Sequence, residues 1–210
     1  MKQPKIVIID YGVGNINSVF NALNYLGYKN ILVSNEYEQI FKSNAIILPG
    51  VGAFAECMRN LKERNLDKIL TEAVMEQSKP ILGICVGMQL MANSSEEAGY
   101  HNGLGWIPGV VRRLQVPPSF SVPHVGWNDI EAVSENSILS RLPKNLNFYF
   151  DHSFHYECNE EFSMAQCNYG IKINAAIHRN NIIGVQFHPE KSQNNGLRLF
   201  RSFISSIEKC

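Results

Sequence analysis

The sequence predicts a single α/β domain over residues 1–210, with a mainly parallel central sheet flanked by helices and a second half rich in antiparallel strands. Three observations lead to this fold class. Short apolar runs alternate with amphipathic stretches through the first ninety residues, polar turns divide the later part into strand-like runs, and no repeat or linker interrupts the chain. With 210 residues and 45% hydrophobic content, the chain fits one domain with a sizeable core.

The first half alternates strands and helices in the order that a parallel sheet requires. Residues 5–9, 31–33, 45–48 and 80–84 are short apolar runs typical of strands buried on both faces. Between them, apolar residues three or four apart predict helices from Ile16 to Leu26, with Gly27 as the stop, and around Leu66 to Val74. A further helix is expected over 88–92.

The second half favours antiparallel strands joined by turns. The expected strands are 109–114, 124–133, 148–158, 163–168, 171–178 and 182–188, and turns such as 168–170 and 179–181 separate several of them. The chain closes with an amphipathic helix that carries Leu197, Phe200, Ile204 and Ile207 on one face. This helix is expected to pack back on the sheet.

Composition excludes several classes of function. The formal net charge of zero argues against nucleic acid as a general partner, although a local basic patch stays open. The longest apolar runs fall far short of the ~20 residues of a membrane helix. The five cysteines form no C-x-x-C pair, and no secretory leader is visible, so we expect a cytoplasmic protein without a disulfide framework. Only 18% of residues are charged, against ~25% in typical soluble domains, which suggests a covered surface.

Gly83-Ile84-Cys85-Val86-Gly87, between a strand and a helix, is the cysteine form of a nucleophile elbow. Such a strained turn needs glycines on both sides of the nucleophile. The N-terminus of the following helix favours thiolate, and the Val86 N–H points where an oxyanion would form. The alternative is a small buried cysteine in a tight turn.

His188 is the best candidate for the base that a cysteine nucleophile needs. Residues i and i+2 of a strand project to the same side, so Glu190 is expected beside His188, where it would orient the imidazole. Pro189 favours an extended His188. The alternative is that His188 has only a structural role at the end of a strand. Because His188 and Cys85 are far apart in the sequence, their contact is a prediction about the fold.

Two glycine-containing turns in the first half complete the candidate site. Gly50 and Gly52 follow a buried strand and could let a peptide N–H turn toward a neighbouring site as a second oxyanion donor. Taken alone, the motif favours the alternative, a plain β-turn before a helix. The turn around Gly12 and Gly14 suggests a competing class, a dinucleotide-binding protein. That class is disfavoured because Asn17 replaces the third glycine of the fingerprint.

The remaining aromatic and histidine motifs do not indicate a metal. His152 and His155 lack a third ligand at a recognisable interval, so no metal site is predicted. Core packing explains most of the aromatic residues. Trp127 beside Asn128 would make a good interface anchor if it is exposed.

Together, five motifs resemble those of class I (triad) glutamine amidotransferases, and more narrowly the glutaminase subunits of imidazole glycerol phosphate synthase. The motifs are Pro49-Gly50-Val51-Gly52, Gly83-Ile84-Cys85-Val86-Gly87-Met88-Gln89, Pro123-His124-Val125-Gly126-Trp127-Asn128, Tyr149-Phe150-Asp151-His152-Ser153 and Gln186-Phe187-His188-Pro189-Glu190-Lys191-Ser192. The resemblance covers essentially the whole chain, and it implies the single-domain amidotransferase fold.

The resemblance implies a role for each matching residue. Cys85 would be the nucleophile, His188 the acid and base, and Glu190 the residue that orients His188. The oxyanion would be held by peptide N–H groups of Val86 and of the loop that contains Val51 and Gly52. The glutamine site would include Gly52, Gln89, Tyr149, His152 and Ser153, and the partner-facing positions would be Asn15, Trp127, Asn128 and Lys191.

The resemblance also implies a substrate and a partner, with no cofactor. L-glutamine would be hydrolysed to glutamate and ammonia, and the ammonia would travel to a (β/α)₈-barrel cyclase that forms a heterodimer with this chain in histidine biosynthesis. Asp151 stands where an apolar residue is usual, and Val125 replaces the commoner Met. Very similar subunits feed sugar amidotransferases of surface-polysaccharide synthesis, which is the alternative partner. A protein that only mediates interactions is a second class to test.

Overall fold

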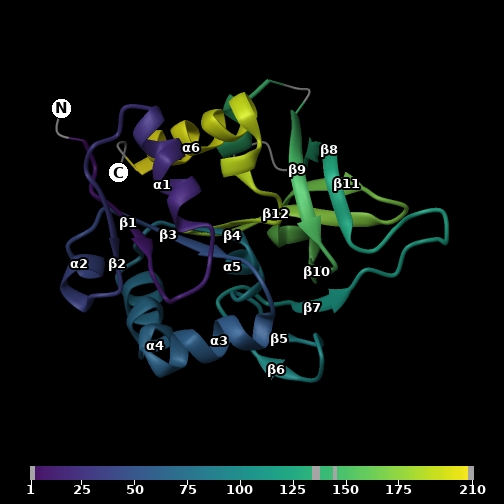
Figure 1. The fold of residues 1–210 in the computed structure, drawn as a ribbon, viewed down its shortest axis with the longest axis horizontal. Helices are drawn as coiled ribbons and strands as arrows, with labels where there is room; N and C mark the ends of the chain where they lie inside the picture. Colours follow the sequence, from purple (N-terminus) through teal and green to yellow (C-terminus); the bar gives the residue numbers. More distant parts are fainter. Residues whose placement is uncertain (1–2, 134–137, 144–145, 208–210) are drawn as a thin grey trace.

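A nine-stranded mixed sheet forms the centre of the molecule (Figure 1). The computed structural model describes residues 3–133, 138–143 and 146–207. The strand order is β2-β1-β3-β4-β13-β12-β11-β8-β9, and the first five strands run parallel. These strands are β1 (Ile6–Ile9), β2 (Ile31–Ser34), β3 (Ala45–Gly50), β4 (Ile81–Cys85) and β13 (Ile182–Val185).

The other four strands of this sheet are antiparallel, as the turn-rich second half predicts. They are β8 (His124–Ala132), β9 (Leu146–His152), β11 (Ser163–Asn168) and β12 (Lys172–Arg179). A smaller sheet has the order β10-β7-β5-β6, with β5 (Ser94–Ser95), β6 (His101–Asn102), β7 (Val110–Arg113) and β10 (Phe154–Glu157). The α/β fold class and the mixed sheet are confirmed.

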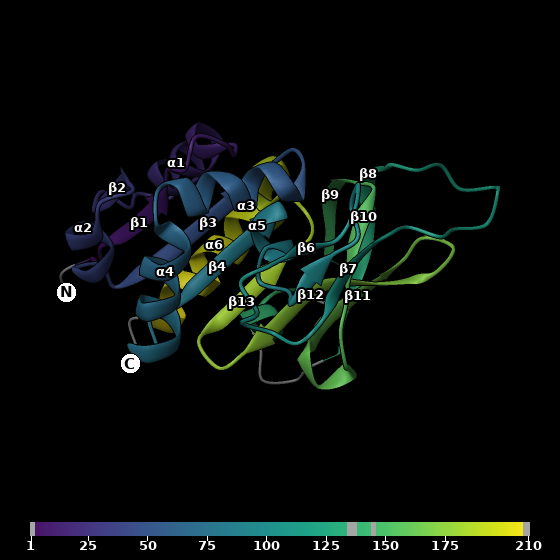
Figure 2. The ribbon, with the colours of Figure 1, turned by 90° about the horizontal axis from the view of Figure 1, so that it is seen from below.

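Helices cover both faces of the parallel part, as a sheet buried on both faces requires. Helices α1 (Ile16–Tyr25) and α6 (Gln193–Ile207) lie on one face, and α3 (Phe54–Glu63) and α4 (Leu66–Thr71) lie on the other (Figures 1 and 2). Strands β1, β3 and β4 are buried along their whole length. The uninterrupted apolar sequences of these strands therefore form the part of the hydrophobic core that the sheet contributes.

The shorter helical segments complete the chain. They are α2 (Tyr37–Phe41), α5 (Val86–Gln89), the π turn η1 (Glu72–Glu76) and the 3-10 turns η2 (Ile138–Arg141), η3 (Glu160–Phe162) and η4 (Pro189–Lys191). The sequence reading missed α2 and α3, and it took α4 and η1 as one helix. In the described part of the chain, no helix is long and apolar enough to cross a membrane.

The expected single strand over 148–158 is wrong, because the chain breaks at Ser153. The strand before the break, β9, pairs with β8 in the large sheet, whereas β10 pairs with β7 in the small sheet. The alternating burial of β9 stops at this point. One apolar run therefore serves two sheets, and the break lies beside the cavity described below.

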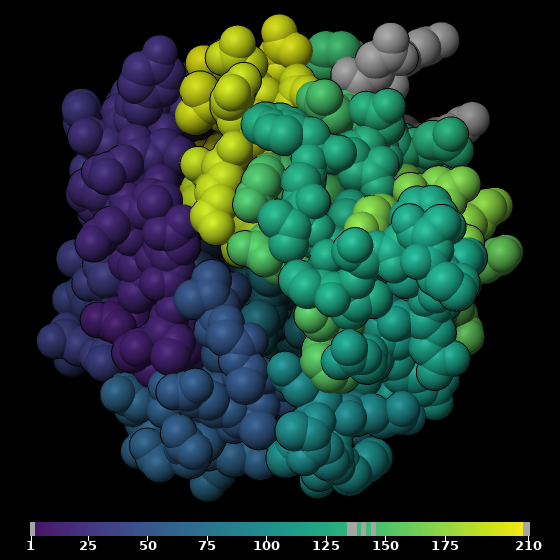
Figure 3. Space-filling view, turned by 45° about the vertical axis from the view of Figure 1, so that its right-hand side comes forward, coloured from purple at the N-terminus to yellow at the C-terminus, as the bar shows by residue number. Residues whose placement is uncertain are grey.

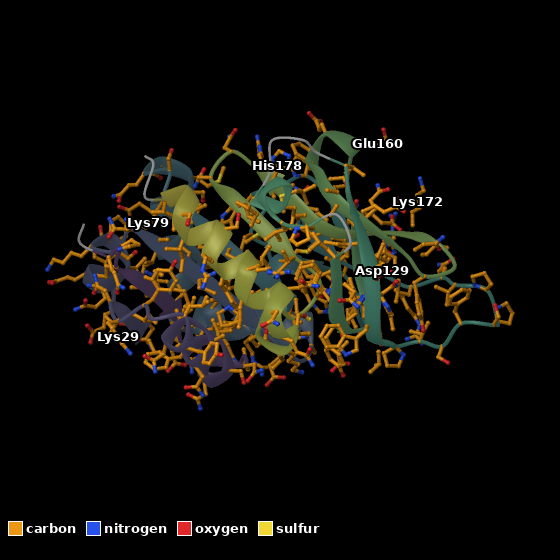
Figure 4. All side chains as sticks on the ribbon, turned by 90° about the horizontal axis from the view of Figure 1, so that it is seen from above. Lys29, Lys79, Asp129, Glu160, Lys172 and His178 are labelled. Atoms are coloured by element: carbon orange, nitrogen blue, oxygen red, sulfur yellow. The ribbon has the colours of Figure 1, made fainter. Side chains whose placement is uncertain are left out.

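Charged side chains are spread over the outside of the molecule. Figure 4 labels Lys29 at one end, and Asp129 of β8 and Lys172 of β12 on the strand-rich side. Lys79 is half-buried, since its ammonium group donates to the carbonyl oxygens of Phe41 and Ser43.

Candidate active site

Cys85 ends β4 in a strained backbone conformation. Its φ is 54° and its ψ is −112°, a region that residues other than glycine rarely occupy. A Cβ at Gly87 would lie 1.9 Å from the carbonyl oxygen of Leu48, and one at Gly83 would lie 2.5 Å from the methyl group of Met91. The two glycines are therefore required by close packing, as the elbow motif predicts.

The helix after Cys85 is shorter than the sequence predicts. Helix α5 ends at Gln89, and the next amide N–H groups bond three residues back, from Met91 to the carbonyl of Met88 and from Ala92 to that of Gln89. The expected helix after Cys85 is present, but it spans Val86–Gln89 and not 88–92. A single turn has little dipole, so the helix N-terminus contributes little to stabilising a Cys85 thiolate.

His188 and Glu190 form a buried pair beside Cys85. His188 Nδ1 lies 2.8 Å from Glu190 Oε1, and the two side chains are 3% and 1% exposed. The expected strand ends earlier than predicted, at Val185, and residues 189–191 form the turn η4. The predicted pairing is therefore present, although a 3-10 turn and not the i, i+2 spacing of a strand produces it.

The charge on His188 is set by its neighbours. Burial lowers the pKa of His188, but hydrogen bonds that the imidazolium donates to the Cys85 sulfur and to the Glu190 carboxylate outweigh it and raise the pKa to about 10. Because Nδ1 donates to Glu190, the other ring nitrogen, Nε2, is the one available to Cys85. Asn15 also donates to Glu190 Oε1 over 3.2 Å, whereas the buried Glu190 Oε2 has no hydrogen-bond partner among the residues that the structure describes.

The loop after β3 passes directly beside the elbow. Gly50 pairs with Cys85 across the sheet, and a Cβ on Gly50 would lie 2.5 Å from the Gly87 nitrogen. The carbonyl of Val51 accepts from the Cys57 thiol at 3.5 Å. The Gly50–Gly52 segment thus approaches the Cys85 backbone closely, as an oxyanion loop must.

These segments surround one cavity of about 730 Å³ on the surface. Figure 3 shows a hollow where segments from the N-terminal half, the strand-rich half and the C-terminal part meet. Ten of the predicted site residues line the cavity: Asn15, Val51, Gly52, Cys85, Val86, Gln89, His152, Ser153, His188 and Lys191. The turn around Gly14 also lines it, so that turn belongs to the same site.

The other predicted residues lie outside the lining. Glu190 is behind His188, and Tyr149 packs outward against Trp127, with ring centroids 6.4 Å apart. The Lys191 ammonium lies 5.5 Å from the centre of the Tyr149 ring. Trp127 is 47% exposed, whereas Asn128 lies on the opposite face of β8 and bonds inward.

Three polar residues of the site were assigned no role from the sequence. Glu97 lines the cavity and accepts the Phe54 N–H at 2.8 Å, and Asp151 lines it from β9. Gln186 is fully buried, and its Nε2 lies 3.8 Å from Cys85 Sγ. Gln186 could have been found from its place in the His188 motif, but Glu97 has no local signal because only the fold brings it to the cavity.

Within the described residues, no group of three or more His, Cys, Asp or Glu side chains is arranged to hold a metal ion. Cys57, Cys85, Cys158 and Cys167 are free thiols, and Cys210 lies outside the described residues. The groups gathered at the cavity around Cys85 include its buried thiol, the His188 imidazole and two peptide loops.

Residues 7–206 match the family model for class I glutamine amidotransferases. The chain belongs to the class I glutamine amidotransferase family. It is 47% identical over 204 residues to "Imidazole glycerol phosphate synthase subunit HisH 2" of Vibrio vulnificus, covering 97% of this chain and 95% of that protein. It is 44% identical to subunit HisH of Leptospira interrogans, covering 95% and 99%.

Solved structures show the same fold at low sequence identity. A putative GMP synthase subunit of Thermoplasma acidophilum has a TM-score of 0.75 and 19% identity, and the match covers 100% of this chain and 96% of that one. PurLQS of Thermotoga maritima has a TM-score of 0.74 and 17% identity, with coverage of 98% and 100%. These likenesses confirm the fold, whereas the family model and the HisH relatives show that the chain is a glutamine amidotransferase enzyme.

Proposed function

We propose that this chain is the glutaminase subunit of an imidazole glycerol phosphate synthase. It hydrolyses L-glutamine to glutamate and ammonia in the cytoplasm, as one domain over residues 1–210, and passes the ammonia to a cyclase subunit for histidine biosynthesis. The relatives named as HisH subunits, similar over nearly the full length of both chains, support the pathway. The observation that carries the chemistry is Cys85, held at a strained elbow beside the buried His188–Glu190 pair.

The reaction begins with attack of the Cys85 sulfur on the side-chain amide carbon of glutamine. As the S–C bond forms, the carbonyl electrons move to oxygen, and N–H groups of Val86 and of Val51 or Gly52 stabilise the oxyanion. His188 Nε2 gives its proton to the leaving nitrogen, which departs as ammonia. A water molecule, deprotonated by His188, then attacks the thioester, and glutamate leaves as the Cys85 sulfur is regenerated.

Glu190 acts through His188. A carboxylate that accepts from Nδ1 fixes the imidazole tautomer that presents Nε2 to the sulfur, and it stabilises the imidazolium. Its side chain is almost fully buried, so this interaction is little weakened by solvent. Asn15 holds the same carboxylate oxygen from the other side.

Polar groups around the cavity suit the charged ends of glutamine. The Glu97 carboxylate is a suitable acceptor for the α-ammonium group, since one of its oxygens is already fixed by the Phe54 N–H. Gln89, His152 and Ser153 supply hydrogen-bonding groups on the neighbouring wall. These positions are assigned as the substrate site.

The outward cluster of Trp127, Tyr149 and Lys191 is assigned as part of the partner-facing surface. Tyr149 was predicted for the glutamine site, but its ring packs against Trp127 outside the cavity lining. The exposed Trp127 ring, the half-buried Tyr149 ring and the Lys191 cation are suited to anchor another protein. Asn15 completes the assigned surface. Asn128, predicted for the same surface, bonds inward to His124 and to the Asn168 carbonyl instead. We propose a (β/α)₈-barrel cyclase as the partner, which forms a heterodimer and receives ammonia through its interior.

A sugar amidotransferase of surface-polysaccharide synthesis is the second candidate partner. Asp151 favours considering it, because this exposed carboxylate sits at the cavity and pairs across β8 and β9 with the exposed Val125. Adding each purified partner to the chain and measuring glutamine hydrolysis decides between them. The true partner stimulates hydrolysis, and the other does not.

Replacement of the nucleophile tests the proposed activity. In Cys85→Ala, ammonia release from glutamine should be lost, while ammonia added directly still supports the reaction of the partner. Cys158→Ala is the matched control, because this half-buried thiol lies outside the cavity lining. Glutaminase activity retained in Cys85→Ala would overturn the assignment of the nucleophile.

A further inference from the structure

A chain of hydrogen bonds runs beneath β8 toward the cavity. His124 and His152 are paired across β8 and β9, and His124 Nδ1 lies 3.0 Å from His152 Nε2. His152 Nδ1 lies 2.8 Å from the carbonyl oxygen of Phe154. At the other end, Asn128 Nδ2 lies 3.3 Å from His124 Nε2 and 3.0 Å from the carbonyl oxygen of Asn168.

The chemistry of these groups fixes the direction of every bond. A carbonyl oxygen only accepts, so His152 Nδ1 carries the proton, and in a neutral ring His152 Nε2 is then an acceptor. His124 must therefore donate from Nδ1, which leaves its Nε2 to accept from the Asn128 amide. Both rings are neutral, since burial lowers the pKa of His124 to about 4 and that of His152 to about 3.

Packing holds the two rings in this arrangement. His124 is 2% exposed and stacks between Phe150, at 4.7 Å, and Tyr169, at 3.9 Å between ring centroids. His152 is 6% exposed and meets the His124 ring edge-on. A proton on His152 Nε2 would face the His124 Nδ1–H, so the alternative tautomer breaks a buried hydrogen bond.

The same carbonyl continues the chain to the nucleophile. The Phe154 oxygen also accepts from Gln89 Nε2 at 3.0 Å, and Gln89 Nε2 donates to Gln186 Oε1, also at 3.0 Å. Gln186 Nε2 in turn contacts the Cys85 sulfur. Both amide protons of Gln89 are thus used inside the protein, which leaves its oxygen as the group that it can offer to the cavity.

We propose that His124 and Asn128 are positioning residues for the glutaminase site. Their hydrogen bonds hold His152 as the Nδ1–H tautomer and, through the shared Phe154 carbonyl, fix Gln89 so that its oxygen faces the substrate. This proposal rests on the proposed function. It also gives the inward-facing Asn128 a role distinct from that of its outward-facing neighbour in β8, Trp127.

The tautomers can be observed without any enzyme assay. In nitrogen-15 NMR spectra of the full chain labelled at histidine, both His124 and His152 should show a protonated Nδ1 and an unprotonated Nε2, unchanged between about pH 5.5 and 8. Loss of signals in His124→Asn assigns one ring, and His178→Asn provides a reference. An Nε2–H tautomer at either ring, or titration in this range, would overturn the proposal.

Kinetics of the chain with its partner test the consequence for glutamine. His124→Leu, which removes both ring nitrogens, should raise KM for glutamine by about fivefold or more, with a smaller change in kcat. His124→Asn, which keeps a donor near Nδ1, should recover most of this loss. His178→Asn, on β12 and away from the cavity lining (Figure 4), should behave as wild type.

The outcomes separate the two proposals. If folded His124→Leu binds glutamine as well as wild type does, the positioning role is refuted. If wild-type protein with either candidate partner hydrolyses no glutamine, the proposed function fails, and the NMR result alone then decides whether the hydrogen-bond chain has the stated direction. Alkylation of Cys85 by iodoacetamide should be unchanged in both His124 variants, since the reagent needs no contact with Gln89.

Discussion

Replacement of Gly87 by alanine tests whether close packing demands the glycines of the elbow. A Cβ at this position would lie 1.9 Å from the Leu48 carbonyl oxygen and 2.9 Å from its carbonyl carbon. Ordinary van der Waals contact begins at 3.4 Å, so the elbow and β3 would have to separate by about 1.5 Å, the difference between 3.4 and 1.9 Å. Both atoms of Leu48 are backbone, and neither can rotate away.

The unfolding free energy lost in Gly87→Ala should therefore lie at the upper end of the range for overpacked sites. Such substitutions cost about 1–3 kcal/mol, and we expect about 3 kcal/mol here, which lowers Tm by roughly 6–12 °C in a chain of this size. Urea unfolding at constant m-value measures the change in the free energy of unfolding. Glutamine hydrolysis should also fall, because the same separation moves the Val86 N–H away from the loop after β3.

Gly52→Ala is the matched control for Gly87→Ala. Gly52 has a φ of +91°, but a Cβ there would meet nothing within 4 Å, so only backbone strain of about 1–2 kcal/mol is expected. If Gly87→Ala is no less stable than Gly52→Ala, or loses less than about 1 kcal/mol, packing does not explain the glycine and the steric reasoning is wrong.

Three further substitutions or reactions test the charges and thiols of the site. The pKa of His188 is raised from its unfolded value near 6.5 to about 10, so its contribution to stability is complete below about pH 6.5 and is lost as pH rises toward 10. Glu190→Gln should lower this pKa and reduce the loss of unfolding free energy between pH 6.5 and 9, and an unchanged pH dependence would contradict the assignment. Asn15→Ala removes one hydrogen bond from the Glu190 carboxylate. This variant should lower kcat about threefold to tenfold and leave KM unchanged. A change confined to KM would instead place Asn15 in substrate binding. A glutamine-analogue electrophile should label Cys85 selectively, because burial raises the pKa of Cys57 and Cys158 to about 11 and that of Cys167 to about 12. Mass spectrometry measures the labelling of each cysteine. Equal labelling would support a protein that only mediates interactions.

The features that the sequence predicts correctly are those with local causes. Strands β1, β3 and β4 are uninterrupted apolar runs because both faces of a parallel sheet are covered. The elbow is equally local, since Gly83 and Gly87 are neighbours of the strained Cys85 itself. The positions of these strands along the chain, and the position of the elbow at a strand end, could therefore be predicted before any contact was known.

The features that the sequence reading misses depend on distant segments. Nothing near Ser153 indicates that the strands on its two sides join different sheets, because the pairing of β10 is decided by β7. Glu97 likewise reaches the cavity only because its carboxylate accepts the first N–H of α3. The length of α5 was also overestimated, since the apolar residues after Gln89 fold into tight turns and not into a longer helix.

The short α5 changes how the thiolate is stabilised. A one-turn helix offers Cys85 little positive potential, so the favourable charge must come from His188, and His188 is kept protonated by Glu190. The Glu190 carboxylate in turn is held by Asn15 from the loop after β1. The nucleophile is therefore controlled by two segments from opposite ends of the chain that meet at the rim of the cavity. Asn15 and Lys191 both line the cavity. A partner protein that contacts its edge would therefore contact the two segments that control the charge on His188.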